Sequence, residues 1–322
     1  MKRRRVGRVT VLAGGVGAAR LLRGLVTLVR PRDLTVIVNT ADDDVFHGLH
    51  VSPDVDTILY TLAGLSDPGR GWGLQGDTFH MVDALERYGS ETWFRLGDRD
   101  LATHLFRTEE LRAGRTLSEI TARQARALGV PSKVLPMSDG PVRTRIDTAS
   151  GRLSFQEYLV RERARPTVRS IRYEGIRSAK PAPGVLSSVE TADLVVIAPS
   201  NPFVSIGPIL GLSGVRAAVR RASAPVVAVS PLIGGRPVKG PADRMMRALG
   251  MKPTPVPLAE LYRDLLDGLV IDNADRSFVP ALEERGLRVS TTNTLMKTQT
   301  RSVAVAREVV ATAEAVRAAL AS

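Results

Sequence analysis

A short apolar strand that ends in a glycine-rich turn constrains the fold of this chain more than any other feature. The run from Val9 to Ala13 leads into this turn, and apolar residues then recur at helical spacing from Ala18 to Val29. Leu34 to Asn39 is a second apolar run. Strand, helix and strand with short connections form a βαβ unit, which predicts a parallel sheet with a right-handed crossover.

Later apolar runs predict that the same sheet continues through most of the chain. Four further buried strands are predicted at Leu194–Ala198, Val226–Ser230, Leu269–Asp272 and Leu287–Ser290. Helical spacing predicts helices at Asp56–Leu65, Thr78–Tyr88, Leu101–Ala113, Ser118–Gly129 and Arg301–Leu320. In the middle, a hairpin of Val142–Asp147 with Arg152–Tyr158 and a strand at Ala164–Tyr173 are predicted to be antiparallel.

These elements predict an α/β fold with a doubly wound, mostly parallel, Rossmann-like sheet. No repeat, low-complexity linker or clean boundary divides the sequence, so we expect one domain over residues 1–322. About residues 100–180 are predicted to form an inserted, smaller α+β segment that covers the substrate.

Composition narrows the classes of function. The chain has no Cys, which excludes disulfides and thiolate metal sites and agrees with a cytoplasmic protein. No window is long and apolar enough for a membrane helix, and glycines and Arg20 interrupt the apolar N-terminal stretch, so neither a membrane span nor a signal peptide is predicted. The net charge of +12 favours anionic ligands, but the basic residues are dispersed and no nucleic-acid-binding motif is present.

The glycine-rich turn is a candidate phosphate site. Its glycines are Gly14, Gly15 and Gly17. Such glycines let the backbone approach a ligand, and the start of the following helix favours an anion. The third glycine of the dinucleotide fingerprint is replaced by Arg20, so a nicotinamide-dependent dehydrogenase is not expected. A tight turn with a structural role alone is the alternative.

An acidic cluster follows the second predicted strand. It comprises Asp42, Asp43, Asp44, Asp54 and Asp56. Carboxylates at the carboxyl end of a parallel strand can hold Mg²⁺ against phosphate oxygens. The alternative is that single members cap helices or are merely solvated. The neighbouring His47 and His50 are expected to form hydrogen bonds rather than a zinc site.

Three further loops carry polar candidates. In the segment Phe94–His104, Arg99 is suited to clamp phosphate, or alternatively belongs to a surface network with Asp100 as helix cap. Ser200 and Asn201 follow a predicted strand between two prolines, and an Asn side chain can pair with a base edge. A later glycine-rich loop supplies Lys239.

Together these motifs resemble the 2-phospho-L-lactate transferase family of coenzyme F(420) biosynthesis, including its phosphoenolpyruvate-transferring members. The resemblance rests on GGVGAARLL, VNTADDD, SPDVDTILYTLAG, WFRLGDRDLATHL, LPMSDGPVRT, IAPSNPFVSIGPI, SPLIGG with VKGPAD, and TLM, which occur in this order. It implies a donor in which guanosine diphosphate carries a three-carbon acid, and an acceptor, FO, which is a deazaflavin with a terminal ribityl hydroxyl. It also implies attack on the outer phosphorus, release of GMP, a requirement for Mg²⁺ and a homodimer.

The resemblance also implies roles for individual residues. Asp56 matches the acid at the FO hydroxyl and the metal, and Asp42 matches a second catalytic and metal-binding acid. Arg95 and Asp98 are implied to bind FO. The implied nucleotide-binding residues are Gly14, Gly15, Gly17, Ser200, Asn201, Pro202 and Lys239. Because this chain has Ala41 and an additional acid, Asp44, which aspartates of the cluster bind the metal stays open.

Two other functions are compatible with these residues. One is a non-enzymatic nucleotide-binding regulator, against which the motifs PDVDT and LGDRD argue. The other is a sugar-phosphate nucleotidyltransferase, which would attack the inner phosphorus and release pyrophosphate. The sequence leaves the three-carbon acid open, although the excess of Arg over Lys, typical of GC-rich bacterial genomes, favours phosphoenolpyruvate.

Overall fold

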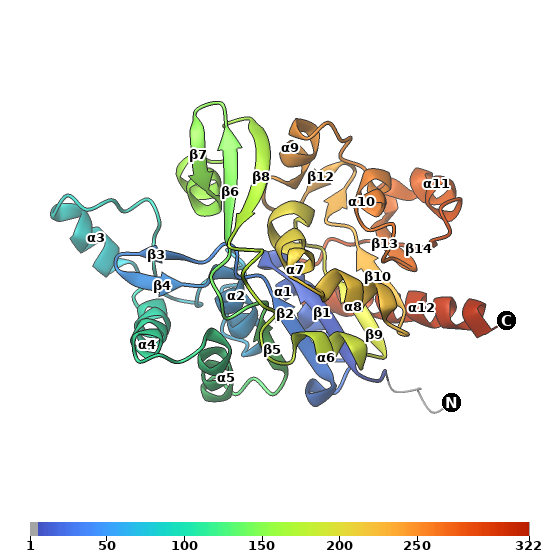
Figure 1. The fold of residues 1–322 in the computed structure, drawn as a ribbon, viewed down its shortest axis with the longest axis horizontal. Coiled ribbons are helices and arrows are strands. Elements are labelled where there is room, and N and C mark those ends of the chain that lie inside the picture. Colours follow the sequence, from blue (N-terminus) through green and yellow to red (C-terminus); the bar gives the residue numbers. More distant parts are fainter. Residues whose placement is uncertain (1–5, 322) are drawn as a thin grey trace.

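The computed structural model describes residues 6–321 and places a seven-stranded parallel sheet at the centre of the molecule (Figure 1). The strand order is β14-β13-β10-β9-β1-β2-β5, and every neighbouring pair is parallel. The strands are β1 (Val9–Ala13), β2 (Leu34–Val38), β5 (Lys133–Pro136), β9 (Leu194–Ile197), β10 (Val226–Val229), β13 (Gly268–Asp272) and β14 (Arg288–Thr292). The predicted α/β fold is therefore confirmed.

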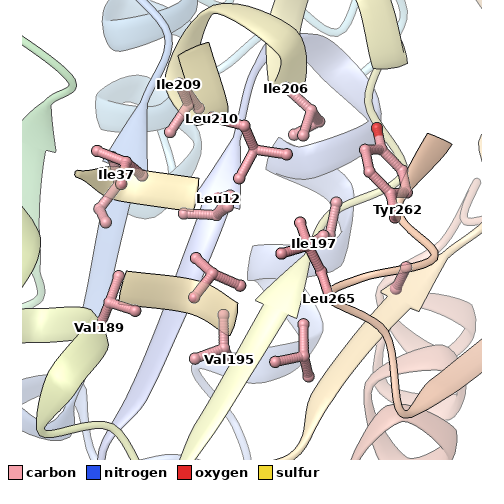
Figure 2. Close-up of a cluster of buried hydrophobic side chains, with 14 of the residues drawn as sticks. Leu12, Ile37, Val189, Val195, Ile197, Ile206, Ile209, Leu210, Tyr262 and Leu265 are labelled. Atoms are coloured by element: carbon pink, nitrogen blue, oxygen red, sulfur yellow. The ribbon is translucent and has the colours of Figure 1, made fainter. Parts of the chain in front are cut away.

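Helices cover both faces of this sheet. One face packs on α1 (Gly15–Leu25), α2 (Pro53–Leu62), α5 (Leu117–Ala127) and α12 (Gln299–Ala321). The other packs on α6 (Val185–Glu190), α7 (Gly207–Gly211), α8 (Val215–Arg221), α10 (Pro255–Leu261) and α11 (Val279–Glu283). Figure 2 shows part of the second core, where Leu12 and Ile197 of the sheet contact side chains such as Ile209 and Leu265.

Alternation along the strands explains why both faces are apolar. In β1, Val11 and Ala13 belong to the core under α1, whereas Leu12 belongs to the opposite core. Successive side chains of a strand point to opposite faces, so a strand covered on both sides must be apolar throughout. The short uninterrupted apolar runs of the sequence have this physical cause.

The order of the strands reverses next to β1. From β1 the chain adds β2 and then β5 on one side, and later returns to add β9, β10, β13 and β14 on the other. In open α/β sheets, ligands bind at the carboxyl ends of the strands where the order reverses. The loops after β1 and β9 meet at this position. Ser200, in the loop after β9, donates its Oγ hydroxyl to the carbonyl of Gly14, which follows β1 (2.8 Å), and accepts from the Gly14 amide (3.2 Å).

Smaller elements surround this end of the sheet. A hairpin of β3 (Asp44–Phe46) and β4 (Leu49–Val51) projects with α3 (His80–Arg87) and α4 (Asp100–Arg112) on one side (Figure 1). A three-stranded antiparallel sheet of β6 (Arg143–Thr148), β7 (Gly151–Ser154) and β8 (Val168–Glu174) lies on another. The pair β11 (Leu232–Ile233) and β12 (Arg236–Pro237) precedes α9 (Ala242–Ala248).

Several elements differ from the sequence-based expectations, among them the short helices α6 to α11, which were not predicted, and three segments nearer the site. The stretch Lys133–Pro136, for which no strand was predicted, forms the edge strand β5, so the segment of about residues 100–180 contributes to the central sheet as well as to the smaller one. The hairpin β3–β4 was not predicted, since each strand has only three residues. The second strand of the predicted hairpin ends at Ser154, and a π-helix follows at Glu157–Arg161.

Among residues 6–321, no single helix is long and apolar enough to cross a membrane. Two consecutive helical segments, Pro202–Gly211 and Val215–Arg221, are long and apolar enough only when taken together, and they meet at an angle of 87°. Their side chains Ile206, Ile209 and Val215 are buried against the central sheet.

Candidate active site

A cavity of about 610 Å³ opens at the carboxyl end of the parallel strands. Its wall is formed by the glycine-rich turn, the first turns of α2 and α4, and the loops that follow β9 and β10. Of the residues predicted to be functional, the cavity brings together Gly14, Gly15, Gly17, Asp42, Asp56, Arg95, Ser200, Asn201 and Lys239. Most of the predicted candidates thus lie around one space, although they come from five separate segments.

The glycine-rich turn is shaped by contacts within the protein. Gly15 has a φ of +68°, a conformation that residues with a side chain rarely adopt. A Cβ atom on Gly17 would come 2.2 Å from the Pro199 carbonyl oxygen of the loop after β9. Gly15 is therefore required by its backbone conformation and Gly17 by the packing of the two loops, which supports the structural interpretation of this turn.

Asp54 caps the helix that follows the turn. The Gly15 amide donates to Asp54 Oδ1 over 2.8 Å, at the N-terminal end of α1. Asn39, at the end of β2, holds a second acid next to it, because its Nδ2 donates to Asp54 Oδ2 and to Asp42 Oδ2, each over 3.0 Å. One amide group thus bridges two buried carboxylates.

No cationic side chain of the described chain is bonded to this carboxylate pair. Burial, followed by the charge of Asp54, raises the pKa of Asp42 well above its ordinary value. Burial also raises the pKa of Asp54 to about 6, although the Asn39 and Gly15 hydrogen bonds oppose the shift. The Asp42 Oδ1 atom is buried and lacks a hydrogen-bond partner among residues 6–321. Two adjacent buried carboxylates without a bonded cation provide a site that favours a cation.

Asp56 has a different environment, although it follows Asp54 by two residues. Both of its carboxylate oxygens accept hydrogen bonds from Arg107 of α4, with Nη1 at 3.0 Å from Oδ2 and Nη2 in contact with Oδ1. The Arg107 side chain is completely buried, and Asp56 is 4% exposed. The protein itself therefore neutralises Asp56 with a bidentate ion pair.

Arg107 is held in turn by a ring of polar groups. It donates to the Gln124 side chain (3.3 Å) and to the His50 carbonyl (3.4 Å). The His104 Nδ1 atom lies 3.3 Å from Arg107 Nη1 and 3.7 Å from Asp56 Oδ2. Asp100 lies 3.4 Å from the other ring nitrogen of His104. This network joins α2, α4, α5 and the β3–β4 hairpin behind one wall of the cavity.

Two basic side chains line a different part of the cavity. Arg20 extends from the second turn of α1, and Lys239 from the loop between β12 and α9. Burial, followed by the charge of Arg20, lowers the pKa of Lys239, and burial followed by the charge of Arg23 lowers the pKa of Arg20. This wall is the positively charged part of the site.

The remaining wall is apolar and partly aromatic. Its large side chains are Trp72, Trp93, Phe94, Phe155, Leu159 and Val160. Phe94 stacks on Phe46 of the β3–β4 hairpin, with ring centroids 3.7 Å apart and planes within 5°. A cavity that combines carboxylates, cations and aromatic rings can hold a ligand with a charged part and a flat apolar part.

Four predicted residues have roles other than those expected of a ligand-binding group. Asp98 is outside the cavity lining and caps the start of α3, accepting from the Thr78 hydroxyl (2.5 Å) and the amides of His80 and Met81 (2.9 Å each). Pro202 is also outside the lining and is buried at the first position of a π-helix. Asn201 caps that π-helix through its side-chain oxygen. Arg95 lines the cavity but pairs with Asp83 (2.6 Å).

The other candidates of the acidic and histidine cluster lie beside the site. Asp43 accepts from the Ser52 hydroxyl (2.6 Å), and burial raises its pKa to about 8. Asp44 belongs to β3 and caps the Val45 amide. His47 bonds to the Phe94 carbonyl (3.2 Å), as expected for a hydrogen-bonding role. Within residues 6–321, no group of three or more His, Asp and Glu side chains is placed to hold a metal ion.

Sequence reasoning missed two residues of this site and left the role of a third open. Asp54 was one of the five acids of the cluster, with capping as the alternative, and the helix it caps is α1. Arg20 was noted only because it breaks the dinucleotide fingerprint. Arg107 gave no signal, because nothing in a single sequence distinguishes a buried Arg from the many exposed ones.

Comparison with known proteins agrees with the motif analysis. A family model described as 2-phospho-L-lactate transferase CofD matches residues 9–311. A phosphoenolpyruvate transferase of Streptomyces griseus is 43% identical over 317 residues, which cover 97% of this chain and 100% of the relative. A 2-phospho-L-lactate transferase of Methanopyrus kandleri is 45% identical over 306 residues, which cover 94% of this chain and 96% of the relative.

A solved structure supports the architecture. The crystal structure of a UPF0052 family member from Bacillus halodurans superposes with a TM-score of 0.61 and covers 95% of this chain and 99% of its own. The two sequences are only 16% identical, so this likeness concerns the fold alone.

Proposed function

The chain belongs to the 2-phospho-L-lactate transferase CofD family, and we propose that it transfers a phospho-acid group to FO in coenzyme F(420) biosynthesis. The donor is a guanosine diphosphate whose outer phosphate carries a three-carbon acid, so that the group transferred is phosphoenolpyruvate or 2-phospholactate. The terminal ribityl hydroxyl of FO attacks the outer phosphorus, a new P–O bond forms, the phosphoanhydride bond breaks, and GMP leaves with the bridging oxygen. The proton of the hydroxyl passes to a carboxylate of the site.

The observation that carries this proposal is the division of one cavity into two chemically different parts. The Asp42–Asp54 pair, as a cation site, and the basic side chains suit a nucleotide with its phosphates. The wall around Trp93 and Phe94 suits a flat heteroaromatic ring such as a deazaflavin. A transferase needs both substrates in one space, with the reacting atoms close together.

The residues present fit a magnesium ion at Asp42 and Asp54. Asp42 Oδ1 lacks a hydrogen-bond partner among the described residues, and the two carboxylates share one Asn39 amide without a basic partner. Mg²⁺ is bound in such enzymes by one or two carboxylates, and substrate phosphates and waters complete its oxygen shell. Two acids are therefore sufficient, although no larger ligand cluster exists within residues 6–321.

This assignment revises the pair inferred from the sequence. Asp42 keeps its proposed role. The charge of Asp56 is balanced by Arg107, whereas Asp54 accepts only from the neutral donors Gly15 and Asn39, so we assign the second metal-binding position to Asp54. When bound, Mg²⁺ would neutralise charge that develops on the transferred phosphate. Asp56 remains in the cavity wall as a fixed acceptor that can orient the FO hydroxyl.

Each remaining residue has a defined task in this mechanism. Asp42 Oδ1, the buried oxygen without a hydrogen-bond partner among residues 6–321, is the atom that would face the cation, and Asp56 lines the cavity as the carboxylate beside which the FO hydroxyl would lie. Asn39 keeps Asp42 and Asp54 at a fixed separation. The apolar wall excludes water, which would otherwise compete with FO for the phosphorus. No covalent intermediate is needed, because phosphoryl transfer depends mainly on positioning and charge neutralisation.

Mass spectrometry of the products made from FO tests this function. Purified protein is incubated with FO, Mg²⁺ and each guanosine diphosphate-linked donor, and GMP is quantified beside the modified FO. We expect equimolar GMP and phospho-acid-bearing FO. Release of the free phospho-acid together with guanylylated FO would instead indicate attack on the inner phosphorus, as in a nucleotidyltransferase, and FO left unmodified with every donor would contradict the proposal.

A further inference from the structure

Arg20 and Lys239 both lie close to the same short segment of chain. That segment lies in the loop between α2 and α3, at Arg70 and Gly71. The Lys239 ammonium donates to the Arg70 carbonyl oxygen. A Cβ atom on Gly71 would lie 3.8 Å from Arg20 Nη2, so the Arg20 guanidinium is close to the same loop. Both side chains also line the cavity, which places two cations together at one position of its wall.

Neither cation is paired with an acid. Within residues 6–321, no hydrogen bond or ion pair joins the Arg20 guanidinium to another group, and Lys239 has only the Arg70 carbonyl as partner. Asp67 is the acid whose charge acts on Lys239, but its carboxylate is used by the amides of Gly69 and Arg70 and by the Arg70 side chain. The half-buried Arg20 and the exposed Lys239 therefore repel each other, with the Asp67 charge acting on Lys239 as the only compensation from a nearby acid among residues 6–321, and an anion would relieve this.

The start of α1 does not provide the anion site that the glycine-rich turn suggests. Its Gly15 amide already donates to Asp54, and the adjacent Gly14 amide donates to Ser200 Oγ. A carboxylate of the protein thus occupies the position that a phosphate occupies at other helix N-termini. The negative groups of a donor nucleotide need other partners, and Arg20, one turn further along α1, is a cation facing the same cavity.

We propose that Arg20 and Lys239 together form the oxyanion-binding position of the donor site. This inference rests on the proposed function, because it takes the donor to be a nucleoside diphosphate that carries an acid. The oxyanion is a phosphate or the carboxylate of the three-carbon acid. Arg20 suits it, since a guanidinium donates two parallel hydrogen bonds to either group.

The experiment compares Arg20→Gln with the matched control Arg23→Gln by titration calorimetry with GDP, GMP and guanosine. Arg23 lies on the same helix but bonds to Gln299 of α12, outside the cavity lining. We expect Arg20→Gln to weaken GDP binding roughly 10- to 100-fold, as for the loss of hydrogen bonds to a charged group, and to leave guanosine binding unchanged. Arg20→Lys should recover part of the affinity, and Arg23→Gln should resemble the unchanged protein.

Transfer to FO with the acid-bearing donor distinguishes the two oxyanions. If Arg20→Gln weakens GDP binding, the cations hold phosphate. If GDP binding is unchanged but the KM for the donor rises about tenfold or more, they hold the carboxylate of the acid. If Arg20→Gln matches Arg23→Gln in both assays, the inference is overturned. Failure of the proposed function is a separate result, in which the unchanged protein gives no transfer, while the GDP titrations still test the cation pair.

Discussion

Two pairs of side chains within the same site show opposite ways of treating a buried carboxylate. Asp42 and Asp54 share the Asn39 amide and have no basic partner among the described residues, and burial raises the pKa of both. Asp56, two residues after Asp54, is bound in a bidentate pair by the completely buried Arg107. One pair is left with unbalanced negative charge, whereas the other is balanced within the fold.

The difference separates a functional pair from a positioning pair. A buried charge is costly unless it is paired, so a fold that leaves two acids together loses stability at that point. Such local strain is retained where a ligand relieves it. Asp56 and Arg107 instead link α2 to α4 and fix the wall on which the acids lie. Variants of the Asp56–Arg107 pair should therefore mainly lower stability, whereas variants of the Asp42–Asp54 pair should mainly lower turnover.

The largest effect is expected for Arg107→Met. This change leaves Asp56 buried without its partner, which costs about 3–5 kcal/mol in the free energy of unfolding. Urea denaturation followed by circular dichroism measures the loss. The double variant Asp56→Asn with Arg107→Met should recover much of it, because no isolated charge remains. A single variant that unfolds at the same urea concentration as the unchanged protein would show that the pair does not stabilise the fold.

Asp42→Asn is expected to act on turnover instead. Loss of the carboxylate should lower single-turnover transfer about 100-fold, which corresponds to roughly 3 kcal/mol of transition-state stabilisation. The metal-free protein should become slightly more stable, because the repulsion between Asp42 and Asp54 is removed. Asp44→Asn is the control, since Asp44 is a partly exposed member of β3. If Asp42→Asn retained more than half of the turnover, the proposal that the Asp42–Asp54 pair takes part in the reaction would be contradicted.

Asp98→Ala should have the smallest effect. The Asp98 carboxylate caps the start of α3 and lies outside the cavity lining, so its loss should lower stability only slightly, as for the loss of other exposed helix caps. The KM for FO and the turnover should remain near those of the unchanged protein. A clear rise in the KM for FO, with stability unchanged, would restore the FO-binding role that the family resemblance implied for this residue.

The sequence predicted the sheet better than the site. Short apolar runs that end in polar loops indicated six of the seven parallel strands, because strands buried on both faces must be apolar throughout. The edge strand β5 was missed, since Lys133–Pro136 is short and begins with an exposed Lys. The parallel pairing with β2 holds this segment in the sheet, although its own sequence does not have the long apolar pattern of a buried strand.

The site was predicted at the level of segments but not of single partners. Loops after parallel strands meet at one edge, so the motifs correctly placed Asp42, Ser200 and Lys239 around one cavity. Which of two acids, Asp54 or Asp56, pairs with a basic side chain depends on Arg107, which lies 51 residues beyond Asp56 in the sequence. Spacing within PDVDT carries no information on that contact.

The central claim is that the Asp42–Asp54 pair, and not Asp56, holds the divalent cation. Calorimetric titration of Mg²⁺ in the presence of GDP tests it directly in Asp54→Asn and in the double variant Asp56→Asn with Arg107→Met, with folding checked by circular dichroism. We predict that Asp54→Asn weakens Mg²⁺ binding about tenfold or more, whereas the double variant stays within about threefold of the unchanged protein. Tight Mg²⁺ binding by Asp54→Asn, together with its loss in the double variant, would contradict the account and return the metal to Asp56.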